Sequence, residues 1–135
     1  MGFTADDRTQ ITELISMHGH LCDSGELERL DDLFTPDAVY DVSDFGQEPL
    51  LGSAARIEAA RALGERNPVG HHVTNVVLTD VADDRVHART KGIGVYADGT
   101  AGSVTYEDTI VRTPQGWRIS HRKIRAHRAP LGGRA

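Results

Sequence analysis

The sequence predicts an α+β protein in which helices come first and β-strands follow. Apolar side chains recur at helical spacing between residues 4 and 64, whereas four runs rich in β-forming residues follow residue 70. Helices followed by consecutive strands are typical of an antiparallel sheet that folds over the helices. The chain has 135 residues, which is the size of one domain, and we expect a single domain over residues 1–135.

The first predicted helix begins after Thr4 and ends at Ser24-Gly25. Thr4 can cap its N-terminus, and Asp6 and Asp7 lie in the first turn, where the helix dipole favours acidic side chains. One face of this helix is apolar, and it consists of Ile11, Leu14, Ile15, His18, Leu21 and Cys22. The spacing predicts a helix that packs this face inward.

Shorter elements are predicted before the sheet. They are a short helix from Glu26 to Phe34, a strand over residues 38–42, a loop over residues 43–51, and a helix that Ser53 caps and Gly64 ends. The sequence Thr35-Pro36-Asp37 ends the short helix. The four long strands are then predicted over residues 71–81, 85–96, 102–112 and 116–126, separated by turn sequences such as Asp98-Gly99.

The composition disfavours several kinds of partner and location. A formal net charge of −5 does not favour nucleic acid or an acidic membrane. Cys22 is the only cysteine, which excludes an internal disulfide and suits a reducing compartment. The first residues lack the pattern of a signal peptide, and no apolar run approaches about 18 residues, so we expect a cytoplasmic protein.

The C-terminal segment is an exception to the acidic balance. It contains Arg118, Arg122, Lys123, Arg125, Arg128 and Arg134, with no acid among them. It is either a solvated last strand with a tail or a surface that binds phosphate or acids. Aromatic residues are not interleaved with these charges, which disfavours stacking on nucleic-acid bases.

Three segments of the chain resemble one known family. They are LCDSGELERLDDLFTPDAVYD near the first helix, HHVTNVVL at the first long strand, and YEDTIVRTPQGWRISHR at the last hairpin. In this order and spacing, they are similar to the nuclear transport factor 2-like superfamily. Within it, the chain resembles the SnoaL-like proteins, which include relatives of scytalone dehydratase, polyketide cyclases and ketosteroid isomerase.

The resemblance implies a cone-shaped α+β barrel. Its N-terminal helices would pack on a curved, mainly antiparallel sheet and enclose a mostly apolar cavity. Relatives use such a cavity for dehydration, isomerisation, aldol cyclisation or epoxide opening without a cofactor, while others only bind ligands or proteins. We therefore expect a small hydrophobic molecule as ligand, no cofactor and a symmetric homodimer. Fold alone leaves the activity open.

Two residues are the leading candidates for chemistry. The resemblance implies that His71 is a general acid/base, a role that suits an imidazole near neutral pH. It also implies that Asp23 faces the cavity and holds this imidazole, as in other carboxylate–histidine pairs. Each has a structural alternative: His71 could bond a backbone carbonyl at the start of its strand, and Asp23 could be a turn residue at a helix end. His72 has the opposite strand parity and should point away.

Other side chains could complete such a site. His18 lies on the apolar face of the first helix, where many relatives have a tyrosine, and Tyr106 lies on a strand that lines the cavity in relatives. Both are candidate hydrogen-bond donors to a substrate oxygen. The structural alternative for His18 is a core histidine whose nitrogens are satisfied within the protein. Candidate substrate-binding residues are Cys22, Tyr40, Asp108, Trp117 and His121. For Asp108 we expect a partner in Arg112 or Arg118. Strand parity places Trp117, Ile119 and His121 on one face, where we expect Trp117 to belong to the core.

The sequence also departs from the dehydratase pattern. The strand after His71 supplies no second acid between Thr90 and Gly94. Gly92 and Gly94 leave space, which suits a bulky ligand or a bent strand. The histidines lack zinc-site spacing with cysteines, and no phosphate loop is present, so no metal is expected. A dehydratase or isomerase is the preferred prediction. The alternatives are a polyketide-type aldol cyclase and a non-catalytic ligand-binding or scaffolding domain.

Overall fold

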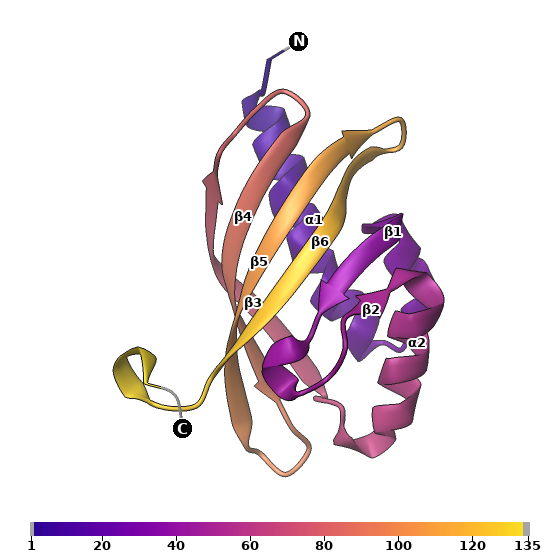
Figure 1. Ribbon diagram of the computed structural model, residues 1–135, viewed down its shortest axis with the longest axis vertical. Coiled ribbons are helices and arrows are strands. Elements are labelled where there is room, and N and C mark those ends of the chain that lie inside the picture. Colours follow the sequence, from indigo (N-terminus) through magenta and orange to yellow (C-terminus); the bar gives the residue numbers. More distant parts are fainter. Residues whose placement is uncertain (1, 134–135) are drawn as a thin grey trace.

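The computed structural model describes residues 2–133 and has the predicted α+β class (Figure 1). Its helices are α1 (Ala5–Asp23) and α2 (Gly52–Leu63), with short 3-10 helices at Leu27–Asp32, Ser43–Phe45, Gly64–Arg66 and Pro130–Gly132. Its strands are β1 (Phe34–Asp41), β2 (Leu50–Leu51), β3 (Gly70–Thr79), β4 (Arg85–Val95), β5 (Ala101–Thr113) and β6 (Gly116–His127).

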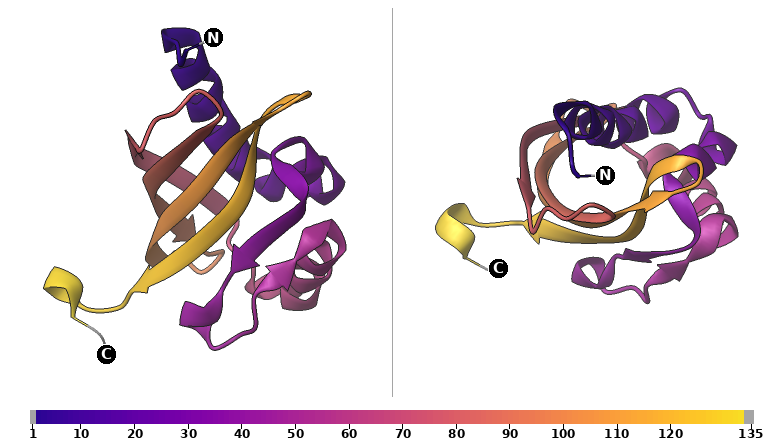
Figure 2. Two further views of the ribbon diagram at one scale, coloured as in Figure 1. Left: turned by 45° about the horizontal axis from the view of Figure 1, so that its top comes forward. Right: turned by 90° about the horizontal axis from the view of Figure 1, so that it is seen from above.

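The strands form one curved sheet in the order β2-β1-β6-β5-β4-β3. Neighbours are antiparallel except β1 and β6, which are parallel, so the expected mainly antiparallel sheet is confirmed. The sheet curves around α1, which lies on its concave side (Figure 2). β2 and β3 remain as edge strands, so the sheet is open and does not close into the expected barrel.

The elements before β3 differ from the prediction in detail. The short helix is a 3-10 helix that ends before Leu33, and β1 begins at Phe34, so Thr35 and Pro36 belong to the strand. Proline is tolerated there because the register of β1 with β6 is irregular between Phe34 and Val39. The N-cap of α2 is Leu51, not Ser53, which lies inside the helix.

The apolar face of α1 packs onto the inner face of the sheet and forms the core. Ile11, Ile15 and Leu21 are almost completely buried. Their core cluster includes inward-facing residues of three strands, namely Val86, Ala88, Ile110, Trp117 and Ile119. The helical spacing seen in the sequence therefore predicted the buried face of α1 correctly.

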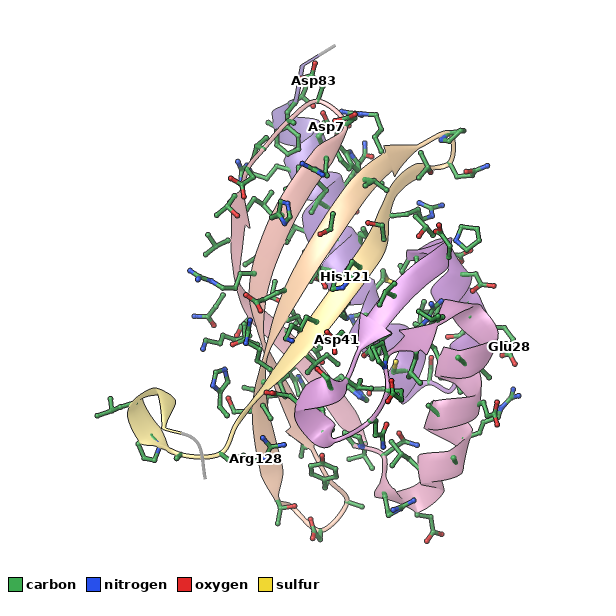
Figure 3. The ribbon with its side chains drawn as sticks, viewed as in Figure 1. Asp7, Glu28, Asp41, Asp83, His121 and Arg128 are labelled. Atoms are coloured by element: carbon green, nitrogen blue, oxygen red, sulfur yellow. The ribbon has the colours of Figure 1, made fainter. Side chains whose placement is uncertain are left out.

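The N-terminus of α1 is fixed to the last hairpin by Asp7 (Figure 3). Thr4 and Asp7 form a capping box, as the cap predicted at Thr4 requires. The Asp7 carboxylate also accepts hydrogen bonds from Arg112 Nη1 and Nη2, both at 3.1 Å, and from Trp117 Nε1 at 3.1 Å. These donors, Arg112 first, hold the pKa of Asp7 far below its ordinary value.

Most of the basic C-terminal run is matched by acceptors within the fold. Arg122 pairs with Asp108, Lys123 lies 3.5 Å from Asp41, Arg125 pairs with Glu107, and Arg128 donates to the backbone carbonyl of Asp44. This arrangement favours the solvated-strand interpretation over an anion-binding surface. Arg134 lies outside the described residues.

The described helices also bear on membrane association. Among residues 2–133, no helix combines the length and the hydropathy needed to cross a membrane.

We predict that Asp7→Asn weakens the fold in a pH-dependent way. The folded-state pKa of Asp7 is depressed, so its contribution is fully present above the unfolded pKa of about 4 and is lost as pH falls below it. Urea unfolding of both proteins should therefore show a difference in free energy of unfolding at pH 7 that shrinks below about pH 4. Asp6→Asn, one residue away and exposed, is the control. An equal difference in free energy of unfolding at pH 7 and at a pH below about 4 would contradict the prediction.

Candidate functional site

Asp23 and His71 meet where the C-terminus of α1 lies against the start of β3. His71 Nδ1 and Asp23 Oδ1 are 2.6 Å apart, and the backbone N–H of His71 also donates to both carboxylate oxygens, at 3.1 and 3.0 Å. Both side chains are partly exposed, at 20% for His71 and 30% for Asp23. The carboxylate thus fixes the orientation of the imidazole through Nδ1. Nε2 is the ring nitrogen that this contact does not occupy. The contact that the resemblance implied is present in the structure.

Gly19, which was not among the predicted site residues, allows this contact. A Cβ at Gly19 would lie 2.5 Å from the backbone oxygen of His71, so only glycine lets α1 approach β3 this closely. The available signal was an isolated glycine inside a strongly helical pattern. Such a glycine costs roughly 1 kcal/mol relative to alanine and usually has a packing reason.

His18 is the centre of a cluster of rings on the inner face of the sheet. Its side chain is 4% exposed. The centroid of its ring lies between 6.1 and 6.4 Å from four other ring centroids, those of Phe34, Tyr40, His71 and Tyr106. The structure therefore brings together four candidates, namely His18 of α1, Tyr40 of β1, His71 of β3 and Tyr106 of β5.

His18 is held as a neutral imidazole. Burial is the main cause that lowers the pKa of His18 well below its ordinary value, and the nearby charges of Arg122, His71 and Arg56 lower it further. Cys22 Sγ lies 3.7 Å from His18 Nε2, and burial raises the pKa of this thiol to about 11. In one tautomer the thiol donates to Nε2 and the ring proton of His18 lies on Nδ1; in the other, Nε2–H donates to Sγ.

The ring of Tyr106 lies against a buried ion pair. Arg122 Nε and Nη2 donate to the two oxygens of Asp108 at 2.8 and 2.9 Å, and both side chains are fully buried. The Arg122 Cζ lies 4.3 Å from the centroid of Tyr106, within cation–π distance. Burial alone would lower the pKa of Arg122, but the Asp108 carboxylate raises it overall.

The partner expected for Asp108 was wrong. Arg112 binds Asp7, and Arg118 donates to the backbone carbonyl of Trp117. Because its carboxylate is engaged by Arg122, Asp108 acts on the site through Arg122, which lies between it and the ring of Tyr106.

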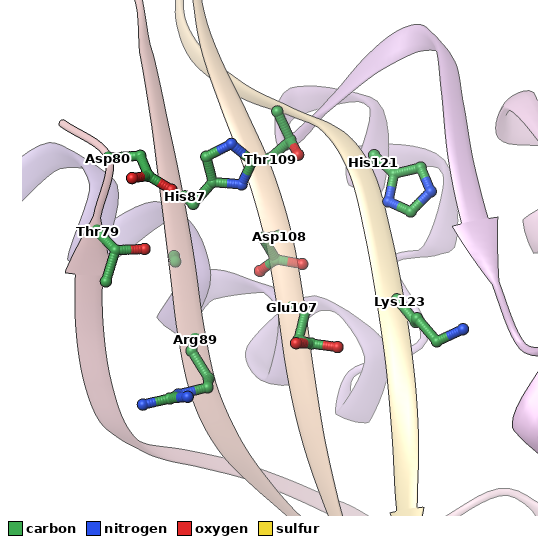
Figure 4. A pocket seen from close by; sticks show the side chains of 10 residues that line it. Thr79, Asp80, His87, Arg89, Glu107, Asp108, Thr109, His121 and Lys123 are labelled. Carbon is green, nitrogen blue, oxygen red and sulfur yellow. The ribbon is translucent and has the colours of Figure 1, made fainter. Parts of the chain in front are cut away.

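Two candidate residues lie away from this cluster. Trp117 is at the other end of α1, beside Asp7, about one helix length from Asp23. His121 lies on the outer face of the sheet, because a β-bulge after Ile119 inserts one residue and reverses the expected parity. There it lines a hollow of about 380 Å³ together with His87, Glu107 and Lys123 (Figure 4).

The space expected at two glycines of β4 is occupied by the protein itself. A Cβ at Gly92 would lie 2.4 Å from the Tyr106 ring, and one at Gly94 would lie 3.2 Å from Pro68. These glycines accommodate neighbouring side chains, and the inner face is closely packed around His18.

Within residues 2–133, no group of three or more His, Cys, Asp or Glu side chains is arranged to hold a metal ion.

Fold and site together define a small-molecule-binding domain of the nuclear transport factor 2-like class. Residues 4–123 match the SnoaL-like domain, and the chain belongs to that family. Among the curated proteins, none matches this sequence.

Several solved structures are similar over most of their length. A nuclear transport factor 2-like protein with a cystatin-like fold from Novosphingobium aromaticivorans is 33% identical, with a TM-score of 0.76 over 96% of this chain and 85% of that chain. A candidate aromatic ring hydroxylase from the same species is 28% identical, with a TM-score of 0.79 over 94% and 93%. LinA, at 21% identity and a TM-score of 0.78 over 94% and 90%, shares the fold.

We predict that Gly19→Ala disrupts the contact between Asp23 and His71. Overpacking costs about 1–3 kcal/mol, which exceeds or cancels the roughly 1 kcal/mol by which alanine favours a helix. NMR of the imidazole ring should show loss of the hydrogen bond at His71 Nδ1, and thermal unfolding should not show the gain expected of an alanine. Ser16→Ala, on the exposed face of α1, is the control. A His71 spectrum identical to wild type would contradict the prediction.

Asp108→Asn should destabilise the protein by about 3–5 kcal/mol, because it leaves the buried Arg122 guanidinium without its counter-charge. Glu107→Gln removes the neighbouring acid on the outer face and should cost less than about 1 kcal/mol. Urea unfolding at pH 7 measures both. The double variant Asp108→Leu/Arg122→Met should recover most of the loss. Equal losses of unfolding free energy for Asp108→Asn and Glu107→Gln would contradict the prediction, because the Arg122–Asp108 pair would then contribute no more than an exposed ion pair.

Proposed function

We propose that the protein is a cofactor-independent acid/base enzyme, a dehydratase or isomerase, that acts on a small hydrophobic oxygenated and cyclic molecule. The single observation that carries the proposal is the hydrogen bond of 2.6 Å between His71 Nδ1 and Asp23. It combines a group able to move protons near neutral pH with a carboxylate that orients it and stabilises its cationic form.

The proposed chemistry begins with a carbon-bound proton next to a carbonyl. His71 Nε2 takes this proton, the electron pair of the broken bond moves onto the carbonyl oxygen, and an enolate forms. The imidazolium then returns the proton, either to another carbon, which completes an isomerisation, or to a hydroxyl that leaves as water, which completes a dehydration. Asp23 keeps its contact with Nδ1 throughout.

The surroundings of the dyad support a cyclic, mostly apolar substrate. His18, Phe34, Tyr40 and Tyr106 offer flat ring surfaces next to His71. The similarity to a candidate aromatic ring hydroxylase points to the same class of compound. A cytoplasmic location and a homodimer remain part of this proposal.

A second candidate is a non-catalytic ligand-binding or scaffolding domain. The absence of a second acid between Thr90 and Gly94 favours it. A polyketide-type aldol cyclase is a further alternative. It would use the same proton abstraction as the dehydratase or isomerase and would differ in the next step, in which the enolate carbon attacks a carbonyl carbon.

Proton exchange at carbon tests the proposal without a known substrate. A panel of cyclic ketones is incubated with the protein in D₂O, and NMR follows the loss of the protons next to the carbonyl. We expect faster exchange with the wild type than with buffer for at least one ketone. His71→Ala should slow it by about 10²–10⁴-fold, the usual contribution of a general base. Asp23→Asn should slow it as well.

His72→Ala is the matched control, because His72 is the next residue on β3 and is exposed. Its exchange rate should equal that of the wild type. Unchanged exchange in His71→Ala would sink the assignment of the base. Ketones that bind without any exchange above buffer would favour the non-catalytic binding domain.

A further inference from the structure

Helix α2 is anchored to the fold by one buried arginine. The structure describes all 12 residues of α2, and Arg56 is the only one of them that is buried. In α1, by contrast, seven residues are buried, among them Ile11, Ile15 and Leu21. Packing of an apolar face supplies most of the stability of a helix in a protein. α2 lies against β1 and β2 at the side of the sheet (Figure 1) and is therefore only weakly held there.

The charge of Arg56 is incompletely matched. Among residues 2–133, its Nε and Nη1 have no hydrogen-bond partner. Asp31 forms an ion pair with Nη2 at 3.6 Å, which is longer than a hydrogen bond, and the side chain of Asp31 is 61% exposed. Burial lowers the pKa of Arg56. Because movement of α2 away from the fold would return this guanidinium to water, the buried charge favours that movement.

Arg56 also connects α2 to the candidate site. Its Cζ lies 4.2 Å from the centroid of the Phe34 ring, within cation–π distance. Phe34 belongs to the ring cluster around His18, since its centroid is 6.1 Å from that of His18 and 6.0 Å from that of Tyr40. Through Arg56, α2 therefore covers the Phe34 side of the ring cluster.

A glycine with a left-handed backbone lies at each end of α2. Gly52 has a φ of 79° and Gly64 a φ of 52°, values that other residues rarely adopt. A Cβ at Gly64 would meet no atom of the described residues within 4 Å, so that end of the helix has room to turn. Residues at the ends of an element that absorb changes in φ and ψ serve as hinges.

The packing of the inner face requires some element to move before a ligand can bind there. The space around the rings is filled, and a Cβ at Gly92 would lie only 2.4 Å from the Tyr106 ring. Strand pairing fixes β1, β3 and β5, which border the ring cluster, and a buried apolar face fixes α1. α2 has neither of these restraints, so it is the element most easily displaced.

We propose that α2 is a lid over the ring cluster, hinged at Gly52 and Gly64, and that Arg56 sets how often the lid opens. The cation–π contact with Phe34 holds the lid closed, while hydration of the guanidinium favours the open position. The proposal rests on the proposed function in one respect, namely that the ligand enters at the ring cluster beside His71. The opening itself depends on no chemistry at that site.

Amide hydrogen exchange of the full chain, followed residue by residue by NMR, tests the lid. In the wild type, the protection factors of residues 57–63 should be at least about 100-fold lower than the highest in α1 and β5, because α2 opens without them. Arg56→Met keeps a long unbranched side chain on Phe34 and removes the charge. It should raise the protection of residues 57–63 about tenfold, because no unmatched charge then favours opening.

Arg61→Met is the matched control on the same helix. Arg61 forms its ion pair with Glu28 at the surface, where the two side chains are 65% and 68% exposed. Loss of such a pair should leave the protection of residues 57–63 unchanged or slightly lower. Protection of α2 equal to that of α1 in the wild type, or unchanged or lower protection in Arg56→Met, would overturn the proposal.

Turnover distinguishes a lid from a helix that is only mobile. Where the wild type exchanges ketone protons, Arg56→Met should raise KM by the same factor as the protection of α2 and leave kcat unchanged, because only open molecules admit the ketone. An unchanged KM would overturn the lid, since the ligand would then enter elsewhere.

The lid and the catalytic proposal can fail independently. If the wild type exchanges no ketone proton, the catalytic proposal is wrong, and the hydrogen-exchange result still decides whether α2 opens. If ketone exchange depends on His71 while α2 is as well protected as α1, only the lid is wrong.

Discussion

The close approach of α1 to β3 is the constraint on which the candidate site depends. Gly19 lets the helix backbone lie against the carbonyl of His71, and one turn later Asp23 reaches the imidazole. The same placement puts His18 among the rings of the inner face. A helix held even slightly further from the sheet would separate the dyad and open the ring cluster, so one missing methyl group determines both features.

Buried polar groups lie at both ends of α1, with Asp7 at its N-terminus and a larger group beside its C-terminal half. The core around Ile11 and Ile15, in the middle of α1, is apolar. The buried polar residues of the larger group are His18, Thr90, Asp108 and Arg122. Burying polar groups opposes folding unless they are paired. The Arg122–Asp108 pair satisfies most of this demand, whereas His18 Nδ1, Thr90 Oγ1 and Arg122 Nη1 have no hydrogen-bond partner among the described residues.

Local patterns explain what the sequence could predict. The long strands were placed within two residues, and the buried face of α1 was correct, because both depend on short-range periodicity. The contact between Asp23 and His71 came from the family resemblance. His121 was misplaced because one inserted residue in β6 reverses all later parity, and no local signal marks that bulge. The partner of Asp108 depended on the same shift, which turns Arg122 inward.

The hydrogen bonds of Asp7 to Arg112 and Trp117 have a consequence for how the chain folds during synthesis. Asp7 bonds to Arg112 and Trp117, which are 105 and 110 residues further along, and β6 lies between β5 and β1 in the sheet. Contacts across such sequence separations form slowly. On the ribosome, α1 can contact β3, and β1 can pair with β2, before β6 is made, but the Asp7 end of α1 gains its partners only with the last hairpin. The part of the apolar helix face that packs on Ile110, Trp117 and Ile119 therefore stays uncovered until the end of synthesis, which is when such a chain depends most on chaperones.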